Sequence, residues 1–274
     1  MKTITLLNSK GGVGKTMLAT HIAAGLALRG ARVLLIDADG QGNATTAFAK
    51  EKRPAFYDLI VRDTSWQDAI VPVNPSLYVN ERFTPQGASE RGGLYLVPGN
   101  DETPGISQRT EDETKIARRL QEVSELFDVA VFDTSPTASM LHSMIHAATN
   151  FLLIPTELEA DSALDGTHAS VRRAVNVRKR AEKYGLDLCR IMGIVPNKFD
   201  VNTNLHVEIY DALRDEYPSW VWEPIKRRTV IAQSKLYKRM IYTHAQDTAA
   251  GKAAAQGLMS VVDRVCEKLE KLHV

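Results

Sequence analysis

The residues with the clearest chemical potential stand near the start of the chain, in Ser9-Lys10-Gly11-Gly12-Val13-Gly14-Lys15-Thr16. This stretch follows an apolar run, Ile4 to Leu7, and precedes a helical pattern from Met17 to Arg29. Glycines between a strand and a helix let backbone N–H groups converge on phosphate oxygens, and the helix start adds unpaired N–H groups. Lys15 can reach the β and γ phosphates of a nucleotide, and the Thr16 hydroxyl can bind Mg²⁺. The stretch therefore predicts a site for a nucleotide with Mg²⁺.

The loop differs from the standard phosphate-binding pattern, G-x-x-x-x-G-K-[ST], at its first position, where Ser9 replaces glycine. A second lysine, Lys10, stands directly before two adjacent glycines. The alternative interpretation is a glycine turn with a structural role only. The strand before the loop and the helix after it favour the nucleotide site.

Acidic residues end two further apolar runs. Arg32 to Ile36 is followed by Asp37 and Asp39, and Asp128 to Phe132 is followed by Asp133. In open α/β sheets the carboxyl ends of the strands line the ligand crevice, so we expect all three carboxylates near the phosphate loop. A buried carboxylate is costly there unless it is paired or near a cation. These residues predict control of a metal ion and of water; a solvated Asp/Gly turn and a plain strand end are the alternatives.

Two groups of basic residues could contact nucleic acid. The first lies in a run with no acidic residue from Lys226 to Met240 and consists of Lys226, Arg227, Arg228, Lys235, Lys238 and Arg239. The second, Arg172 and Arg173, lies in the basic half of an expected helix, for which a solvated face is the simpler interpretation. Basic blocks of this kind contact phosphate backbones without reading the base sequence.

Hydrophobic patterns place these residues on alternating strands and helices. We expect strands at 3–7, 32–36, 94–97, 128–133, 150–155 and 191–195, a short edge strand at 220–222, and helices at 17–29, 111–126, 162–183, 207–217 and 248–272. This order predicts an α/β fold with a doubly wound, mostly parallel sheet and helices on both faces. We expect one domain over residues 1–274, with an insertion-like region at 50–93, which contains Pro54, Pro72, Pro75 and Pro85.

The composition is that of an ordinary globular protein. Of the 274 residues, 44% are apolar and 24% are charged, and the formal charge of +1 argues against a uniformly basic surface. Cys189 and Cys266 are far apart and neither belongs to a C-x-x-C motif, so we expect a reduced, cytoplasmic setting. No apolar run approaches the length of a membrane-spanning helix, about 20 residues.

Three segments resemble the ParA/MinD family of ATPases, which are P-loop NTPases with a deviant Walker A motif. They are K-G-G-x-G-K-T at 10–16, D-x-D-x-Q-G-N at 37–43, and Asp-Thr-Ser-Pro at 133–136. The family usually has proline where Gly40 and Ser135 stand here, and a second threonine where Met17 stands. The resemblance spans most of the chain and is weakest over residues 50–90.

The resemblance implies a role for each site residue. Lys10 crosses a nucleotide-sandwich dimer to the partner's ATP, Lys15 binds phosphate, and Asp39 positions the attacking water, so these three are the expected catalytic residues. Thr16 binds Mg²⁺, with Asp37 and Asp133 near it through water. The nucleotide contacts expected are Lys10, Gly11, Gly12, Val13, Gly14, Lys15, Thr16, Met17 and, for adenine, Asn197, whose alternative role is a strand-end turn.

The resemblance also implies a function. An ATP-dependent homodimer binds double-stranded DNA non-specifically, a ParB-like centromere-binding activator stimulates hydrolysis, and release moves plasmid or chromosome cargo over the nucleoid. The expected location is therefore cytoplasmic and nucleoid-associated. Because no long extension precedes the loop, we expect no separate N-terminal DNA-binding domain.

Other functions remain open at this stage. A MinD-like division-site regulator would bind membrane through an amphipathic terminal helix, whereas the last helix mixes Glu267 and Glu270 with Lys268 and Lys271, so we expect no membrane partner. A ParA-like ATPase could position a cargo other than DNA. A reductase of the nitrogenase iron-protein kind would need paired cysteines, and an amide-forming synthetase would need a substrate pocket that the sequence does not reveal.

Overall fold

Seven strands form one sheet in the computed structural model, which describes residues 1–48, 50–51, 54–80, 92–137, 139–159, 162–183 and 188–270. Their order is β3-β4-β2-β5-β1-β6-β7, and every pairing is parallel except that of the edge strand β3 with β4. The strands are β1 Lys2–Leu6, β2 Arg32–Ala38, β3 Val71–Pro72, β4 Gly93–Val97, β5 Val129–Thr134, β6 Phe151–Glu157 and β7 Arg190–Asn197.

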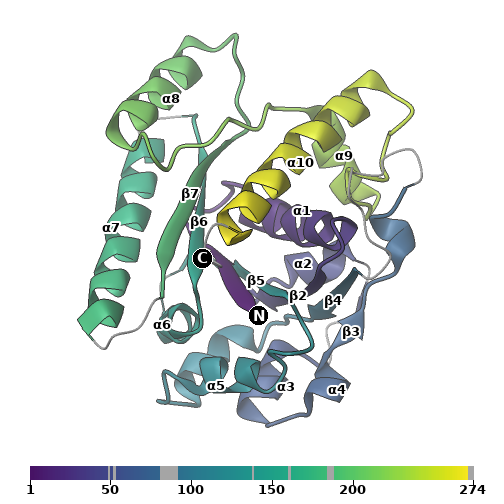
Figure 1. The fold of residues 1–274 in the computed structure, drawn as a ribbon, viewed down its shortest axis with the longest axis vertical. Helices are drawn as coiled ribbons and strands as arrows, with labels where there is room; N and C mark the ends of the chain where they lie inside the picture. Colours follow the sequence, from purple (N-terminus) through teal and green to yellow (C-terminus); the bar gives the residue numbers. More distant parts are fainter. Residues whose placement is uncertain are drawn as a thin grey trace.

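Helices connect the strands and cover both faces of the sheet (Figure 1). In chain order they are α1 Lys15–Leu28, α2 Asn43–Ala47, α3 Phe56–Val61, α4 Trp66–Ala69, α5 Lys115–Gln121, α6 Met140–Ala147, α7 Ser162–Lys183, α8 Asn204–Glu216, α9 Thr229–Leu236 and α10 Ala249–Glu270. Two short 3₁₀ helices, Pro75–Leu77 and Thr103–Gln108, complete the set.

Successive residues of each strand pack on opposite faces, as the two-residue period of a strand requires. Val33 and Leu35 of β2 belong to the core shared with α1 and α10, whereas Leu34 and Ile36 belong to the core shared with α3, α5 and α6. At the other end of the sheet, Leu152 of β6 packs with α7. The doubly wound α/β fold predicted from the sequence is therefore confirmed.

The strand register places the acidic residues of two strands side by side. Asp37 of β2 is paired in register with Asp133 of β5, at the carboxyl ends of both strands. Strand β1, which leads into the glycine-rich loop, lies between β5 and β6. The segments that follow β1, β2 and β5 therefore meet at one edge of the sheet, where ligands bind in open α/β folds.

Several boundaries differ from those expected. The helix expected at 111–126 is regular only over Lys115–Gln121, because Asp112 accepts hydrogen bonds from the backbone and hydroxyl of Thr114 and forms a turn first. The expected edge strand at 220–222 is an isolated parallel bridge between Val221 and Ile194. The segment at 101–108, for which no helix or strand was expected, contains the second 3₁₀ helix.

The region at 50–93 supplies α3, α4, the first 3₁₀ helix and the edge strand β3. Pro85 and residues 271–274, where the last helix was expected to end, lie outside the described residues. Cys189 is buried, Cys266 is partly buried, and both are free thiols. None of the described helices is both long and apolar enough to cross a bilayer.

Candidate nucleotide-binding site

The glycine-rich loop depends on backbone conformations that favour glycine. Gly12 and Gly14 have φ angles of 80° and 99°. A Cβ atom at Gly14 would lie 2.2 Å from Nδ2 of Asn197, so a side chain at this position would collide with the end of β7. The loop can therefore approach β7 closely only because Gly14 has no side chain.

Lys15 lies folded back across the loop. Its Nζ donates hydrogen bonds of 2.9 Å to the carbonyl oxygens of Asn8 and Lys10, and the residue is only 7% exposed. Burial lowers the pKa of Lys15, while Asp133 and Asp39 act in the opposite direction. The ammonium group is thus held at the centre of the loop by two backbone carbonyl oxygens.

Asn8 holds the loop to the neighbouring strand and was not identified from the sequence. Its Oδ1 accepts a hydrogen bond of 2.8 Å from the Lys10 backbone N–H, and its Nδ2 donates one of 2.7 Å to the Pro155 carbonyl of β6. The side chain is 2% exposed. The only signal in the sequence is a polar residue placed between the strand and the first glycine.

Asp37 is fully buried and its carboxylate is well satisfied. Its Oδ2 accepts from the Thr45 backbone N–H at 2.8 Å and from the Thr45 hydroxyl at 2.7 Å. The same Thr45 hydroxyl accepts from the Gly99 backbone N–H at 2.9 Å. Burial nevertheless raises the pKa of Asp37 above its ordinary value, because desolvation outweighs these hydrogen bonds.

Asp133 is fully buried as well, and neither of its oxygens has a hydrogen-bond partner among the described residues. Burial, and then the neighbouring Asp37, raises the pKa of Asp133 well above its ordinary value. The Thr16 hydroxyl, which lies near the carboxylate without meeting hydrogen-bond geometry, and the Lys15 ammonium oppose the shift. Such an unpartnered carboxylate fits a role beside a cation, held directly or through water. No cluster of three or more His, Cys, Asp or Glu side chains that could hold a metal occurs within the described residues. Mg²⁺ at this site would thus rely on Thr16, phosphate oxygens and water as well.

Asp39 is partly exposed and lines the pocket, unlike the two buried carboxylates. Its Oδ1 accepts a hydrogen bond of 3.0 Å from the Gln41 backbone N–H, which orients the carboxylate. Asp39 is open to solvent and lies near the glycine-rich loop, so its carboxylate could contact a water molecule in the pocket. The water-positioning role of Asp39 stays a prediction.

Asn197 ends β7 beneath the glycine-rich loop. Its Nδ2 donates a hydrogen bond of 3.0 Å to the Val13 carbonyl, and the residue lines the pocket while being only 3% exposed. The next residue, Lys198, has a φ of 56° and pairs with Glu157 at 2.6 Å. Asn197 thus joins the loop to β7, and its role in adenine recognition stays a prediction.

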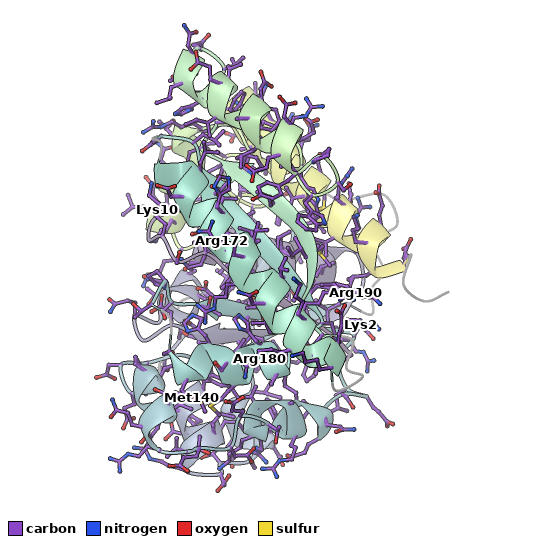
Figure 2. The ribbon with its side chains drawn as sticks, turned by 90° about the vertical axis from the view of Figure 1, so that its left-hand side faces the viewer. Lys2, Lys10, Met140, Arg172, Arg180 and Arg190 are labelled. Carbon is purple, nitrogen blue, oxygen red and sulfur yellow. The ribbon has the colours of Figure 1, made fainter. Side chains whose placement is uncertain are left out.

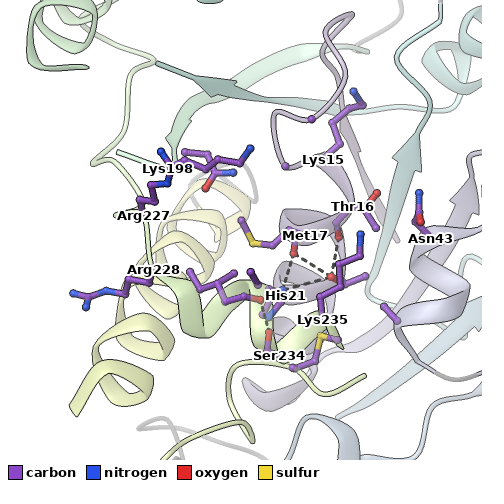
Figure 3. Close-up of a pocket in the computed structure, with 18 of the residues that line it drawn as sticks. Lys15, Thr16, Met17, His21, Asn43, Lys198, Arg227, Arg228, Ser234 and Lys235 are labelled. Atoms are coloured by element: carbon purple, nitrogen blue, oxygen red, sulfur yellow. Dashed lines mark hydrogen bonds between the residues drawn. The ribbon is translucent and has the colours of Figure 1, made fainter. Parts of the chain in front are cut away.

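The loop opens into a pocket of about 690 Å³ (Figure 3). One wall comes from the loop, α1 and Asp39, and the other comes from residues 226–240, which include α9. Figure 3 shows Arg227 and Arg228 on the segment before α9, with Lys15 and Thr16 on the loop side. Of the predicted set, Gly11, Gly12, Gly14, Lys15, Thr16, Met17, Asp39 and Asn197 line the pocket, whereas Lys10, Val13, Asp37 and Asp133 do not.

The predicted DNA-binding residues fall into two separate places. Lys226, Arg227, Arg228, Lys235, Lys238 and Arg239 all line the nucleotide pocket. The two arginines of α7 do not line it: Arg172 is exposed and Arg173 is half-buried. Figure 2 shows Arg172 on the face of the molecule where Lys10 lies. Proximity of the first group to the phosphate loop was not foreseen from the sequence, because the two segments are over 200 residues apart.

Two buried histidines near the site also escaped the sequence analysis. His21 donates from Nδ1 to the Met17 carbonyl at 2.7 Å and accepts at Nε2 from the Ile241 N–H at 3.1 Å. His142 donates from Nε2 to the Ser135 carbonyl, which lies two residues after Asp133. Both support segments that line the pocket, and a lone histidine in a helical pattern gives no sign of such a role.

Known proteins resemble this chain over most of its length. The family model AAA_31, described as an AAA domain, matches residues 1–186. Protein IncC from Escherichia coli is 30% identical over 98% of this chain and 70% of its own length. The sporulation initiation inhibitor protein Soj from Bacillus subtilis is 29% identical over 84% of this chain and 85% of its own.

Among solved structures, cobyrinic acid a,c-diamide synthase from Mycobacterium smegmatis, with a bound ATP analogue and magnesium, superposes with a TM-score of 0.74. The match covers 98% of this chain and 96% of that chain, at 19% identity, and so shows a shared fold alone. The family match, in contrast, covers more than half of the present sequence, including the glycine-rich loop and all three carboxylates. The chain therefore belongs to the AAA_31 family of AAA domains and is a P-loop ATPase of the ParA/Soj partition type.

Proposed function

We propose that this protein is a DNA-partition ATPase whose ATP-bound homodimer grips double-stranded DNA without sequence preference and releases it after hydrolysis. The observation that carries the proposal is the pocket itself, whose two walls are the phosphate loop and the basic segment 226–240. A nucleotide between these walls would contact the phosphate loop on one side and the basic segment 226–240, which is proposed to bind DNA, on the other. Nucleotide occupancy and DNA affinity are then linked through shared structure.

ATP and Mg²⁺ fit the residues present. Lys15 and the loop backbone would hold the phosphates, Thr16 would bind Mg²⁺, and Asp37 and Asp133 would act near it through water. When bound, Mg²⁺ neutralises charge on the β and γ phosphates. Phosphoryl transfer to water depends mainly on positioning and electrostatics, so the chain contributes a fixed Lys15 and an accessible Asp39 that orients water.

Lys10 is the residue proposed to link two subunits into a dimer. Its backbone is fixed by Asn8, and its Cβ lies 3.6 Å from the point where a Cβ atom on Gly166 of α7 would stand. Figure 2 shows Lys10 at the edge of the molecule in that view, and Lys10 does not line the pocket. From this position the ammonium would reach the triphosphate of a second subunit placed face to face, and ATP occupancy would control pairing.

The partner that triggers release is proposed to be a centromere-binding protein of the ParB kind, and the cargo a plasmid or chromosome on the nucleoid. IncC and Soj, the relatives of this chain, support the partition function by their similarity across most of it. An ATPase of the same type that positions a different cargo is the second candidate. A MinD-like membrane role has less support, because α10 places Val262, Val265 and Leu258 in the protein core.

DNA binding measured with ATP, with ADP and without nucleotide would test the proposed function. Affinity for a mixed-sequence duplex should be high with ATP and low with ADP or without nucleotide, and should fall steeply as salt rises. Sedimentation in the same buffers should give a dimer only with ATP. Equal DNA affinity in all three states would refute the proposal, and flotation with anionic vesicles would test the membrane alternative.

A further inference from the structure

The backbone that leaves β5 is held by the sheet only as far as Thr134. Asp133 and Thr134 are the last residues of β5 that pair with β2. The Thr134 hydroxyl also donates a hydrogen bond of 2.7 Å to the Leu6 carbonyl of β1. Ser135 follows outside the sheet, and Pro136, which lines the nucleotide pocket, has no N–H with which to bond its surroundings. The residues after Thr134 therefore need a contact from another element to hold them in place.

His142 of α6 supplies that contact. Its Nε2 donates a hydrogen bond of 3.0 Å to the Ser135 carbonyl, and its Nδ1 accepts one of 3.1 Å from the Ser139 hydroxyl. Ser139 is the residue directly before the first turn of α6. A single neutral tautomer, with its proton on Nε2, makes both hydrogen bonds. The imidazole thus ties the residue that follows β5 to the start of α6.

The surroundings of His142 favour the neutral ring. The residue is 2% exposed, and burial lowers the pKa of its imidazole from the ordinary value of 6.5. The hydrogen bond to Ser135 opposes this shift, whereas the positive charges of Arg173 and Lys15 add to it. At pH 7 the ring is therefore uncharged and carries the one proton that the Ser135 carbonyl accepts.

A second histidine on the same helix shows that burial alone does not create this contact. His146 lies one turn later on α6, is also 2% exposed, and has its ring centroid 6.4 Å from that of His142. Its buried Nε2 has no hydrogen-bond partner among the described residues. The two histidines share a helix and a depth of burial and differ in hydrogen bonding, so His146 is a natural control for His142.

The direction of the Asp133 carboxylate depends on the backbone that His142 holds. Neither carboxylate oxygen has a hydrogen-bond partner within the described part of the chain, so backbone position and packing orient the group. A shift of Ser135 would pass to Asp133, two residues earlier, and to Thr134 and Pro136, which line the pocket. Replacing a residue that orients a group beside a metal typically costs about 10- to 100-fold in metal affinity or activity.

We propose that His142 is a positioning residue for ATP hydrolysis, which holds the segment 133–136 in the arrangement that receives Mg²⁺ with the nucleotide. His142 does not line the pocket, so it acts through the backbone of Ser135 and not by contact with the nucleotide. The inference rests on the placement of Mg²⁺ near Asp133 in the proposed function. It does not depend on DNA binding or on the identity of the cargo.

The test separates nucleotide binding from the contribution of Mg²⁺. ADP with a fluorescent ribose label is titrated with each protein in Mg²⁺ and in excess chelator, and the ratio of the two affinities is the gain due to Mg²⁺. ADP is used because the proposed dimer forms only with ATP. His142→Phe keeps a buried ring and loses both hydrogen bonds, so the gain and the turnover at saturating ATP should each fall about 10-fold. Affinity without Mg²⁺ should stay within about 3-fold, because the phosphate loop is unchanged.

Three further variants locate the effect. His142→Gln keeps an N–H donor near the position of Nε2 and should keep the gain within about 3-fold of the wild type. His146→Phe makes the same replacement one turn away and should keep the wild-type gain. Ser139→Ala removes the hydroxyl that donates to Nδ1 of His142 and should lower the gain about 3-fold. Because the Ser139 side chain makes no capping hydrogen bond to α6, this variant remains informative even where His142→Phe does not fold.

The outcomes that overturn the inference are specific. They are a wild-type gain in His142→Phe, or in Ser139→Ala where His142→Phe does not fold, and an equal loss in His146→Phe. A fall in affinity that is the same with and without Mg²⁺ also overturns it, because the damage is then general.

Asp133→Asn in the same titration tests the premise separately. If Asp133→Asn loses the gain and His142→Phe keeps it, Mg²⁺ lies near Asp133 but His142 does not position the segment, and the inference alone fails. If neither variant loses the gain, the Mg²⁺ placement in the proposed function fails as well.

Discussion

Asp37 and Asp133 are register partners at the ends of two adjacent parallel strands, and both are fully buried. Thr45 satisfies Asp37, whereas neither oxygen of Asp133 has a partner among the described residues. Two ionised carboxylates this close and this deeply buried repel each other and lose hydration. The pair therefore destabilises the nucleotide-free fold at neutral pH, and a nearby cation would offset that cost.

Replacing Asp133 with asparagine should stabilise the nucleotide-free protein. The pKa of Asp133 is raised in the folded state, so its stabilising effect is present at low pH and is lost as pH rises through the folded pKa. At pH 7 the Asp133→Asn variant should unfold with a free energy higher by on the order of 1 kcal/mol, while Mg²⁺-dependent hydrolysis falls. Urea unfolding at pH 7 and pH 5 measures the first effect, and the gain should shrink at pH 5.

Asp211→Asn is a suitable control, because Asp211 is an exposed carboxylate of α8. It should change neither stability nor hydrolysis. A destabilised Asp133→Asn protein at pH 7 would show that Asp133 is not an uncompensated charge in the folded chain.

The two lysines of the loop should separate nucleotide binding from pairing. Lys15 is buried at the centre of the loop, so Lys15→Ala should weaken ATP binding by about 100-fold or more, as loss of a buried charge contact predicts. Lys10→Ala should keep ATP affinity within about 3-fold, since Lys10 does not line the pocket of its own subunit, but should lose dimerisation and hydrolysis. Titration with a fluorescent nucleotide and sedimentation measure the two properties. Loss of ATP affinity in Lys10→Ala equal to that in Lys15→Ala would contradict a role in trans.

Asp39 should affect turnover without affecting occupancy. It is partly exposed and lines the pocket, so Asp39→Ala leaves the buried contacts of Lys15 and Asp37 in place. We expect a variant that binds ATP, dimerises and holds DNA, but hydrolyses ATP at least about 100-fold more slowly, in the range for loss of a group that activates water. Phosphate release measured under saturating ATP gives the result. Turnover at the wild-type rate would remove Asp39 from the mechanism.

The sequence predicted the residues at the carboxyl ends of the strands better than the residues that surround them. The loop and the strand ends carrying Asp37 and Asp133 were found because strand, glycines and helix occur consecutively and each acid ends an apolar run. Thr45 and Gly99 were not found, because the hydrogen bond from the Gly99 N–H to the Thr45 hydroxyl joins segments 54 residues apart, and nothing in the local pattern marks Thr45 as the partner of Asp37. Local patterns contain no information on such long-range contacts.

The short elements were also hard to predict for a physical reason. Helices α3 and α6 are short, and their stability comes from packing against Ile36 and Phe132 of the sheet rather than from propensity. The placement of the basic segment beside the loop depends on the bond between His21 and Ile241, which are 220 residues apart. Spacing along the sequence could reveal neither the packing of α3 and α6 on the sheet nor the hydrogen bond between His21 and Ile241.

His21 should make the fold sensitive to acid. Burial lowers the pKa of His21 to about 4, below the value of about 6.5 expected in the unfolded chain. Its contribution to stability is therefore complete above pH 6.5 and is lost progressively as pH falls toward 4, by about 3 kcal/mol in total. His21→Gln should be less stable than the wild type at pH 7, with a difference that narrows at pH 4.5. Urea unfolding across this range measures the narrowing, and a constant difference would exclude His21 as the acid-sensitive group.

The salt dependence of DNA affinity should show which basic residues contact DNA. Arg228 lies in the pocket wall and Arg172 on the exposed face of α7, so the two report on separate surfaces. Each lost phosphate contact should flatten the slope of log affinity against log salt by about 1 and weaken binding to all sequences alike. If DNA lies on the wall, Arg228→Ala should flatten the slope and Arg172→Ala should leave it unchanged. If the reverse is found, DNA lies on the exposed face of α7 and not on the pocket wall.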